Sequence, residues 1–387
     1  MNDIFEKQYR EILHFLQFED YTLVLKRIID LTLDTEDISF YRETNELLSW
    51  ADYNESNPEG KKEKYSSILE KLYQFLSKKT VTKPGLLLKA ENLKKSYSKS
   101  SFALGPVSMQ VSEGEIIGLV GENGNGKTTL LRALCGELQP TDGNISYSFK
   151  YNDAYELRTR LIYIPQRTNT WYGSMRDNLS FTASSYGIRA EENELTVELI
   201  IARMGLRNYR NLNWKNLSSG YKMRFELARM LLRKPKLLLI DEPLANLDIL
   251  AQQTVLDDFK FIAKSPFRPL GIVLSSQQLY EVEKTSDQVI FLKHGEQKNL
   301  RPQNIGNKTE VVSNDFIIEF ESDWSQEQLY KTLNNLHLSK LQYNGGTYIA
   351  HFPDSVSMNN FLQIVIDENI PVKYLRDISN STRRFFV

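Results

Sequence analysis

Several features that define other classes of protein are scarce in this chain of 387 residues. It has one cysteine, Cys135, so it can form neither an intramolecular disulfide nor a thiolate metal cluster, and a reducing compartment fits. Its histidines are too scattered for a short-spaced metal site; they are His14, His294, His337 and His351. No stretch reaches the ~18 consecutive apolar residues that a membrane-spanning helix needs, so no span is expected.

The chain also lacks an excess of charge of either sign. It has 48 Lys and Arg against 49 Asp and Glu, a formal net charge of −1. Overall charge therefore cannot hold the protein on nucleic acid or on an anionic membrane, although a local basic patch is allowed. Residues 1–7 carry acidic charge without the apolar core of a signal peptide, so secretion by that route is not expected.

The order of sequence patterns divides the chain into three domains. With 41% hydrophobic and 25% charged residues the chain should fold, and its length allows about two to three domains. Apolar residues at helical spacing predict a helical bundle over residues 1–82. Short β-rich runs that alternate with helices predict an α/β domain over 86–301. After a polar linker at 302–309, residues 311–387 show the order β-α-β-β-α-β, which predicts a ferredoxin-like α+β domain.

The predicted helical bundle is strongly acidic. Between Glu11 and Gly60 it has 12 acidic residues and three basic ones, a net charge of −9. A surface of this sign repels phosphate backbones. Two interpretations remain open: a solvated acidic face on a packed bundle, and a docking surface for a basic partner.

A glycine-rich loop in the α/β domain carries the clearest chemical pattern. Two glycines five positions apart, followed by Lys and Thr, come directly after an apolar strand and before a helical stretch. In such a loop, backbone N–H groups surround phosphates, Lys127 reaches the β- and γ-phosphate oxygens, and Thr128 can hold Mg²⁺. The predicted nucleotide-binding residues here are Gly121, Glu122, Asn123, Gly124, Asn125, Gly126, Lys127, Thr128 and Thr129.

Two carboxylates follow a second apolar strand. The run 236–240 ends directly in Asp241 and Glu242. At the end of a strand, Asp241 would lie near Mg²⁺ and Glu242 could polarise a water. On its own, Asp-Glu-Pro is better explained as a turn. The segment Leu-Ser-Ser-Gly-Tyr at 217–221, whose glycine lies 21 residues before Asp241, reverses that judgement and favours a catalytic pair.

With these motifs, residues 86–301 resemble the ATP-binding-cassette (ABC) family. The phosphate loop matches the family pattern throughout. Residues 217–221 resemble the family signature Leu-Ser-Gly-Gly-Gln, with Ser and Tyr at its third and fifth positions. The resemblance is to an ABC transporter ATPase subunit with an exporter-like nucleotide-binding domain. It implies a P-loop α/β fold that binds and hydrolyses ATP with Mg²⁺.

The resemblance also implies roles for residues outside the phosphate loop. Ser218 and Gly220 would cover the γ-phosphate bound by an opposite subunit, and Tyr97 would stack on adenine. Gln166 would sense Mg²⁺ and couple to a membrane partner. The implied catalytic residues are Glu242, Gln166 and Gln277, and the implied metal ligands are Thr128, Gln166 and Asp241. The alternatives are simple packing of Tyr97 in a turn and a plain surface position for Gln166.

One position departs from the family pattern. A histidine normally follows the strand after the catalytic glutamate and contacts the γ-phosphate, and Gln277 stands there in this chain. A glutamine amide can donate a hydrogen bond to a phosphate oxygen, but it cannot become cationic as imidazole can. We therefore expect ATP binding together with slow hydrolysis.

The resemblance implies partners, because a lone cassette is incomplete. In the family, the phosphate loop and the signature lie on opposite sides of a nucleotide, so a head-to-tail homodimer or a second ABC cassette is expected. Residues 167–187 resemble the helical subdomain of exporter cassettes, which docks on membrane-partner helices. The expected protein is cytoplasmic and lies on the cytoplasmic face of the membrane through a separate permease subunit, with no nucleic acid partner.

Two rival functions belong to other classes. The first is a soluble ABC-type ATPase that acts on ribosomes or DNA. Such proteins often pair two cassettes in one chain with basic linkers, and this sequence has one phosphate loop and no net positive charge. The second is a weakly hydrolysing ATP-dependent switch, which the Gln277 departure motivates. Membrane fractionation discriminates the first from transport, and phosphate release discriminates the second.

Overall fold

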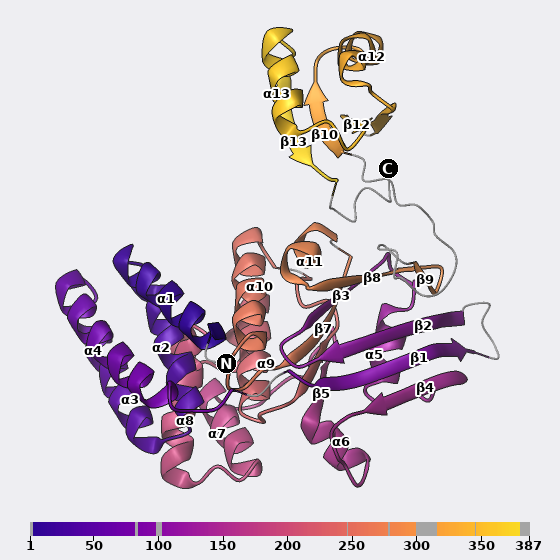
Figure 1. Ribbon diagram of the computed structural model, residues 1–387. Helices are drawn as coiled ribbons and strands as arrows, with labels where there is room; N and C mark the ends of the chain where they lie inside the picture. Colours follow the sequence, from indigo (N-terminus) through magenta and orange to yellow (C-terminus); the bar gives the residue numbers. More distant parts are fainter. Residues whose placement is uncertain are drawn as a thin grey trace. The chain divides into compact units, whose positions relative to one another are not determined.

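The computed structural model describes the chain in seven stretches, residues 3–81, 84–97, 103–245, 247–277, 279–298, 316–344 and 346–379. The chain forms two compact units (Figure 1). The first comprises residues 1–277, 285–288 and 292–297, and the second comprises 278–284, 289–291 and 298–387. The linker predicted at 302–309 lies outside the described residues. Within the described stretches, no helix combines the length and apolar character that crossing a membrane requires.

Four helices form the N-terminal bundle: α1 (Asp3–Gln17), α2 (Tyr21–Thr35), α3 (Ile38–Tyr53) and α4 (Pro58–Leu76). Polar side chains cap three of the N-termini, because Asp20, Asp37 and Asn57 each accept a hydrogen bond from a backbone N–H in the first turn. The core contains fully buried apolar side chains from α1 and α4, among them Phe5 and Leu69. The predicted helical bundle is confirmed.

Two sheets form the middle of the chain. An antiparallel sheet has the order β2-β1-β4, from β1 (Leu86–Ser96), β2 (Ala103–Ser112) and β4 (Asp142–Tyr147). The second sheet has the order β5-β6-β7-β3-β8-β9, from β3 (Ile116–Val120), β5 (Leu161–Ile164), β6 (Leu237–Ile240), β7 (Gly271–Ser276), β8 (Gln288–Lys293) and β9 (Glu296–Lys298). Strands β5, β6, β7 and β3 run parallel. Since parallel strands end at one edge, the segments that follow these four strands meet there.

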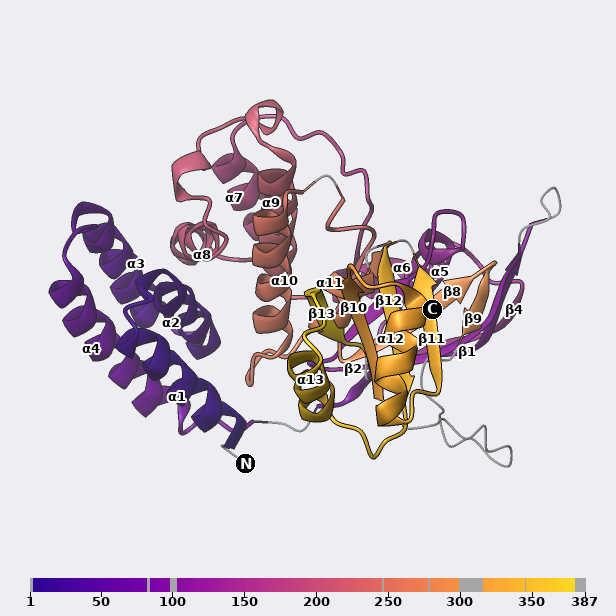
Figure 2. The ribbon, with the colours of Figure 1, turned by 90° about the horizontal axis from the view of Figure 1, so that it is seen from above.

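Helices accompany the parallel strands, whose residues in β3, β6 and β7 are all buried. The helices are α5 (Lys127–Leu134), α6 (Ala154–Arg160), α7 (Met175–Ser185), α8 (Ala190–Arg203), α9 (Ser219–Leu231), α10 (Ile249–Ala263) and α11 (Leu279–Thr285), with the short 3-10 helices η1 (Arg207–Tyr209) and η2 (Trp214–Asn216). Figures 1 and 2 show α7, α8 and α9 gathered apart from the antiparallel sheet. We call α7, α8 and α9 the helical lobe.

The acidic bundle contacts the middle of the chain through ion pairs. Helices α2 and α3 lie against α8 (Figure 2). Arg203, at the end of α8, donates from Nε to Asp30 Oδ1 and from Nη1 to Asp258 Oδ1, both at 2.6 Å. Arg268 Nε donates to Asp34 Oδ1 at 2.5 Å. These two bundle carboxylates therefore pair with arginine side chains of the same chain.

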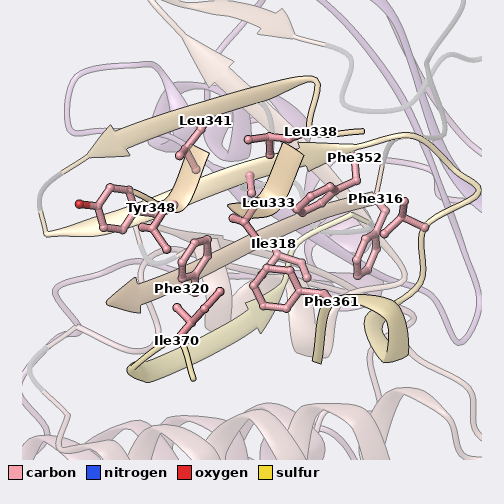
Figure 3. Close-up of a cluster of buried hydrophobic side chains, with 13 residues drawn as sticks. Phe316, Ile318, Phe320, Leu333, Leu338, Leu341, Tyr348, Phe352, Phe361 and Ile370 are labelled. Carbon is pink, nitrogen blue, oxygen red and sulfur yellow. The ribbon is translucent and has the colours of Figure 1, made fainter. Parts of the chain in front are cut away.

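The C-terminal domain is a four-stranded antiparallel sheet with two helices. Its elements are β10 (Phe316–Ser322), α12 (Gln326–Leu333), η3 (Asn334–Leu336), β11 (Lys340–Asn344), β12 (Thr347–Phe352), α13 (Met358–Asp367) and β13 (Val372–Asp377). The sheet order β11-β12-β10-β13 places the first and third strands in the centre, as a ferredoxin-like fold requires. Phe361 of α13 packs edge-on against Phe320 and Phe352 in the core (Figure 3). The predicted α+β fold is confirmed.

Candidate active site

The glycine-rich loop connects buried strand β3 to helix α5, and its backbone geometry requires glycine at three positions. Gly124 and Gly126 have φ values of 83° and 97°, a region that side-chain-bearing residues rarely adopt. A Cβ on Gly121 would lie 2.4 Å from the Leu292 carbonyl oxygen, so only glycine allows this approach of loop and β8. The Asn125 side chain accepts a hydrogen bond from the His294 N–H at 2.9 Å. These contacts hold the loop at the start of α5, where unpaired helix N–H groups attract anions.

Lys127 lies inside this loop with its side chain 5% exposed. Its Nζ donates to the carbonyl oxygens of Gly121 at 2.6 Å and Glu122 at 3.3 Å. The same ammonium lies 3.1 Å from Glu242 Oε1. That contact is an ion pair without hydrogen-bond geometry, so this buried oxygen accepts no hydrogen bond from the described residues. One cation thus connects the phosphate loop to the carboxylate that follows β6.

Asp241 is held by hydroxyl groups from three other elements. Thr128 Oγ1 donates to its Oδ2 at 2.7 Å, and Ser275 Oγ of β7 donates to its Oδ1 at 2.6 Å. Tyr163 OH of β5 donates to Oδ2 at 3.4 Å. Burial, then the nearby Asp241 charge, raises the pKa of the Tyr163 phenol, so it stays a donor. Ser275 Oγ also accepts a hydrogen bond from the Glu242 backbone N–H at 2.9 Å, so it contacts both the Asp241 carboxylate and the backbone of Glu242.

The oxygen donors at this edge fit Mg²⁺. Thr128 Oγ1 and Asp241 Oδ2 are 2.7 Å apart and belong to the ligand types that this ion prefers. No group of three or more His, Cys, Asp and Glu side chains suited to a metal occurs among the described residues. Mg²⁺ usually takes one or two protein carboxylates together with phosphate oxygens and waters, so this sparse set is the expected one. When bound, the ion would neutralise charge on the phosphates.

Two of the remaining predicted residues lie at the same edge of the sheet. Gln166 follows β5, whose Ile164 pairs with Ile240 of β6, and its side chain is exposed. Gln277 directly follows β7 and is also exposed. Tyr97 instead follows β1 of the antiparallel sheet, where the Lys95 ammonium lies 5.5 Å from its ring centroid. The described contacts therefore connect Lys127, Thr128, Asp241 and Glu242, and they connect none of Gln166, Gln277 and Tyr97 to this set.

The signature segment belongs to the helical lobe. Ser218 caps α9, with its Oγ accepting the Tyr221 N–H at 3.4 Å, and its side chain is exposed. A Cβ on Gly220 would meet Ala251 and Leu247 at 3.7 Å, which is ordinary contact. Both views place α9 apart from α5 (Figures 1 and 2). One chain therefore presents a phosphate loop and a signature segment on different parts of its surface.

Sequence reasoning missed some polar residues that the structure connects to this region. Ser275 is fully buried and, with Ser276, ends a strand that begins with the run 271–274. Hydroxyl groups at the end of such an apolar run are the signal that could have marked it. Tyr163 carries no such signal, because only the parallel register of β5 and β6 brings it to Asp241. Buried Glu226 in α9 was missed as well.

A phosphate loop after a buried strand, with two carboxylates at the same sheet edge, defines a P-loop nucleotide-binding domain. The sequence model of the ABC transporter family matches residues 104–245, and the chain belongs to this family, among its ATP-binding proteins. The chain is 35% identical over 213 residues to the ABC transporter ATP-binding protein YxlF of Bacillus subtilis, covering 54% of this chain and 69% of that protein. It is 30% identical to NatA of the same organism, covering 50% and 79%.

A solved structure supports the same assignment. The chain resembles cbiO1 from Clostridium perfringens, described as part of the ABC transporter complex cbiONQ, with a TM-score of 0.50 and 26% identity. The likeness covers 55% of this chain and 87% of that one. The predicted family and P-loop α/β fold are therefore confirmed, and the family is one of ATPases.

Proposed function

We propose that this chain is the ATP-binding and ATP-hydrolysing subunit of an ABC transporter, which pairs head to tail with a second copy or another cassette and drives a separate permease. The observation that carries the proposal is the joined set of Lys127, Thr128, Asp241 and Glu242 at the carboxyl edge of the parallel strands. Phosphoryl transfer depends mainly on positioning and charge neutralisation, and this set supplies both.

The proposed chemistry divides the work among these residues. Lys127 neutralises β- and γ-phosphate oxygens, while Thr128 and Asp241 hold Mg²⁺. Glu242 accepts a proton from a water whose oxygen bonds to the γ-phosphorus, as the bond from that phosphorus to the bridging oxygen breaks. ADP and inorganic phosphate leave, and the proton passes from Glu242 to solvent. The unused acceptor capacity of buried Glu242 Oε1 supports this role.

The Lys127–Glu242 ion pair adds an order to these events. Phosphate oxygens and the Glu242 carboxylate compete for the same ammonium, 3.1 Å from Glu242 Oε1. Binding of the phosphates therefore weakens the hold of Lys127 on Glu242 and makes the carboxylate available as a base. In this scheme the base becomes active only when its substrate is bound.

Gln277 sets the expected rate. Its amide can donate a hydrogen bond to the γ-phosphate but cannot carry positive charge, so turnover should persist and be modest. A weakly hydrolysing ATP-dependent switch is the second candidate, and Gln277 is the observation that favours it. Retention of Glu242 beside Lys127 favours the enzyme, because a switch needs no base.

Exposed aromatic residues support the permease partner. Tyr172 is 85% exposed before α7, and Phe181 within α7 is 72% exposed. Large aromatic side chains that are this exposed are available for contact with another protein. We propose that this segment docks on permease helices at the cytoplasmic face of the membrane. The protein should co-purify with a membrane protein and should not bind protein-free lipid vesicles, because its net charge of −1 gives no attraction to anionic lipid.

Phosphate release tests the enzymatic proposal. Glu242→Gln should keep ATP binding and lower phosphate release by at least about 100-fold, because an amide cannot take the proton. Glu137→Gln is the matched control, since this exposed carboxylate pairs with Arg132. It should release phosphate at the wild-type rate. Equal rates of phosphate release for Glu242→Gln and wild type would show that Glu242 is not the general base. If the wild type released no phosphate even with its membrane partner, the enzymatic proposal would fail and the ATP-dependent switch would be the better function.

A further inference from the structure

Three side chains in the first unit form a closed cluster outside the residues used above, the Trp171–Glu226–Arg229 cluster. Trp171 Nε1 donates to Glu226 Oε1 at 2.6 Å. Arg229 donates to Glu226 Oε2 from Nε at 3.2 Å and from Nη2 at 3.0 Å. The Arg229 guanidinium carbon also lies 4.0 Å from the centroid of the Trp171 ring. Each member therefore contacts both of the others.

Glu226 is buried, so its carboxylate needs the hydrogen bonds that the cluster supplies. Its side chain is 3% exposed, and its neighbours on α9, Phe225, Leu227 and Ala228, are buried and apolar. A buried carboxylate is costly unless it is paired and hydrogen-bonded, and an apolar side chain would fill such a site without that requirement. Arg229 comes from the same helix, so Trp171 is the donor that ties this carboxylate to a different segment.

The cluster connects two segments that carry predicted site residues. Trp171 lies five positions after Gln166 and is the first residue after it, within the described stretch, whose side chain makes a hydrogen bond. Glu226 lies eight positions after Ser218, about 12 Å further along the same helix. A helix of this length moves as one body. A shift of α9 is therefore transmitted through Glu226 and Trp171 toward Gln166.

We propose that Glu226 is a positioning residue that keeps the Gln166 segment in register with α9, acting through Trp171. The inference rests on the proposed function, in which Gln166 serves the nucleotide of its own chain and Ser218 that of the opposite cassette. The cluster then couples the two nucleotides of a dimer. When Ser218 contacts the nucleotide of the opposite cassette, the movement of α9 repositions Gln166 at the nucleotide of its own chain. ATP binding by one chain stays with the phosphate loop and does not need the cluster.

Two mild substitutions test the link without opening a cavity. Trp171→Phe keeps an aromatic ring beside Arg229 and removes the N–H donor. Glu226→Gln keeps the shape and weakens both bonds, because hydrogen bonds to a charged group are about twice as strong as neutral ones. The matched control is Trp214→Phe. Trp214 also packs against α9, with its ring centroid 5.4 Å from that of Phe225, and donates no hydrogen bond to a described residue.

The first measurement is steady-state phosphate release. Trp171→Phe and Glu226→Gln should lower kcat about tenfold and leave KM for ATP within about twofold. The double variant should be no slower than the slower single variant, because both changes break one connection. The Trp214→Phe control should stay within about twofold of wild type in both parameters. Equal losses in the control, or a rise in KM alone, would overturn the proposal.

The second measurement does not depend on turnover. Hydrogen exchange of the backbone amides at 166–171 should become faster in Glu226→Gln and stay unchanged in Trp214→Phe, although Glu226 belongs to α9 and Trp214 packs against it. Binding of a fluorescent ATP analogue should be equal in all variants. If the wild type released no phosphate, the proposed function would fail while this exchange comparison still decided the link. Unchanged exchange at 166–171 in Glu226→Gln would refute it.

Discussion

The two domains outside the ATP-binding cassette are stabilised in different ways. The N-terminal bundle belongs to the same compact unit as the phosphate loop and shares ionised side chains with the cassette. The C-terminal domain belongs to the other unit and encloses its own apolar core, with Phe320, Phe352 and Phe361 packed together (Figure 3). Both domains have an apolar core. The bundle differs because some of its charged side chains also depend on the cassette for their partners.

Arg203 is the centre of the charged contact. It is fully buried and joins α8 to Asp30 of α2 and Asp258 of α10. Burial alone would raise the pKa of Asp30, but Arg203 and Arg27 outweigh it and hold the pKa below its usual range. Burial lowers the pKa of Arg27 to about 10, and its guanidinium carbon lies 3.4 Å from the Phe261 ring centroid. Asp30, Arg27 and Arg203 therefore remain charged at neutral pH.

The C-terminal domain relies on local signals instead. Both of its α-helices begin with a capping box, formed by Ser325 with Gln328 and by Ser357 with Asn360. The hairpin pairs Asn344 with Thr347 across its turn. Each of these contacts lies within a few positions of sequence, so the domain can form its elements without help from the rest of the chain.

The largest expected effect is the loss of Arg203. Arg203→Met should lower the free energy of unfolding by roughly 3 to 5 kcal/mol, because buried Asp258 loses its Arg203 partner at 2.6 Å and, among the described residues, keeps only the Lys26 ammonium at 3.2 Å. Urea unfolding followed by signals from bundle and cassette should show both shifting together. The control is Arg176→Met, because the Arg176 side chain is 41% exposed and its pairs with Glu194 and Glu198 should contribute less than about 1 kcal/mol. Equal losses would mean that the buried contact does not fasten the bundle.

A cavity in the C-terminal core should act on one domain alone. Phe361→Ala should destabilise that domain by about 3 kcal/mol, since a fully buried aromatic ring is removed from contact with Phe320 and Phe352. Hydrogen exchange resolved by segment should show faster exchange in β10 and β12 and no change in α2 or α8. Faster exchange in the bundle as well would contradict the self-sufficient core.

The acid dependence of the bundle contact should divide between two carboxylates. The pKa of Asp30 is lowered, so its stabilisation is present above its ordinary value of 3.8 and is lost as pH falls through the lower folded value. Burial raises the pKa of Asp34 more than Arg268 lowers it, so Asp34 becomes unfavourable as pH rises through its folded value. The stability difference between wild type and Asp30→Asn should therefore grow as pH rises from the lowered folded value through 3.8, by about 1.4 kcal/mol in total per unit of pKa shift, and then level off.

Asp34→Asn serves as the opposite test, because its stability difference from wild type should shrink as pH rises from 3.8 through the raised folded value of Asp34. Unfolding of the three proteins in urea at each pH measures both trends. If the stability differences of the two variants changed in the same direction with pH, the pKa values of Asp30 and Asp34 would not be shifted in opposite directions.

The smallest effect is expected at the rim of the same contact. Arg42 of α3 pairs with Glu191 of α8, and both side chains are more than half exposed. Arg42→Gln should change the free energy of unfolding by less than about 0.5 kcal/mol, because solvent screens an exposed pair. Comparison with Arg203→Met under the same conditions isolates burial as the difference. A loss of stability as large as that of Arg203→Met would show that the exposed pair contributes as much to the contact as the buried one.

Local pattern was enough to predict most of the fold and the centre of the site. Glycine spacing after an apolar strand marked Lys127 and Thr128, and a second strand marked Asp241 and Glu242, because each motif lies within ten residues. Contacts that depend on strand register could not be predicted from the sequence. The Ser275–Asp241 hydrogen bond is one of them, because it depends on the parallel pairing of β6 and β7. The acidic count of the bundle gave the sign of its surface but not its partner, because Asp30 and Arg203 are 173 positions apart.

The bundle also acts as a counter-ion for the cassette. Asp30, Asp34 and Asp52 offset the positive charges of Arg203, Arg268 and Arg207. A chain shortened to begin at Leu86, the sequence border of the cassette, would expose these arginines together. Such a fragment would bind polyanions and column matrices without specificity. The point where the sequence changes character is therefore a poor place to cut, and bundle and cassette should be produced as one piece.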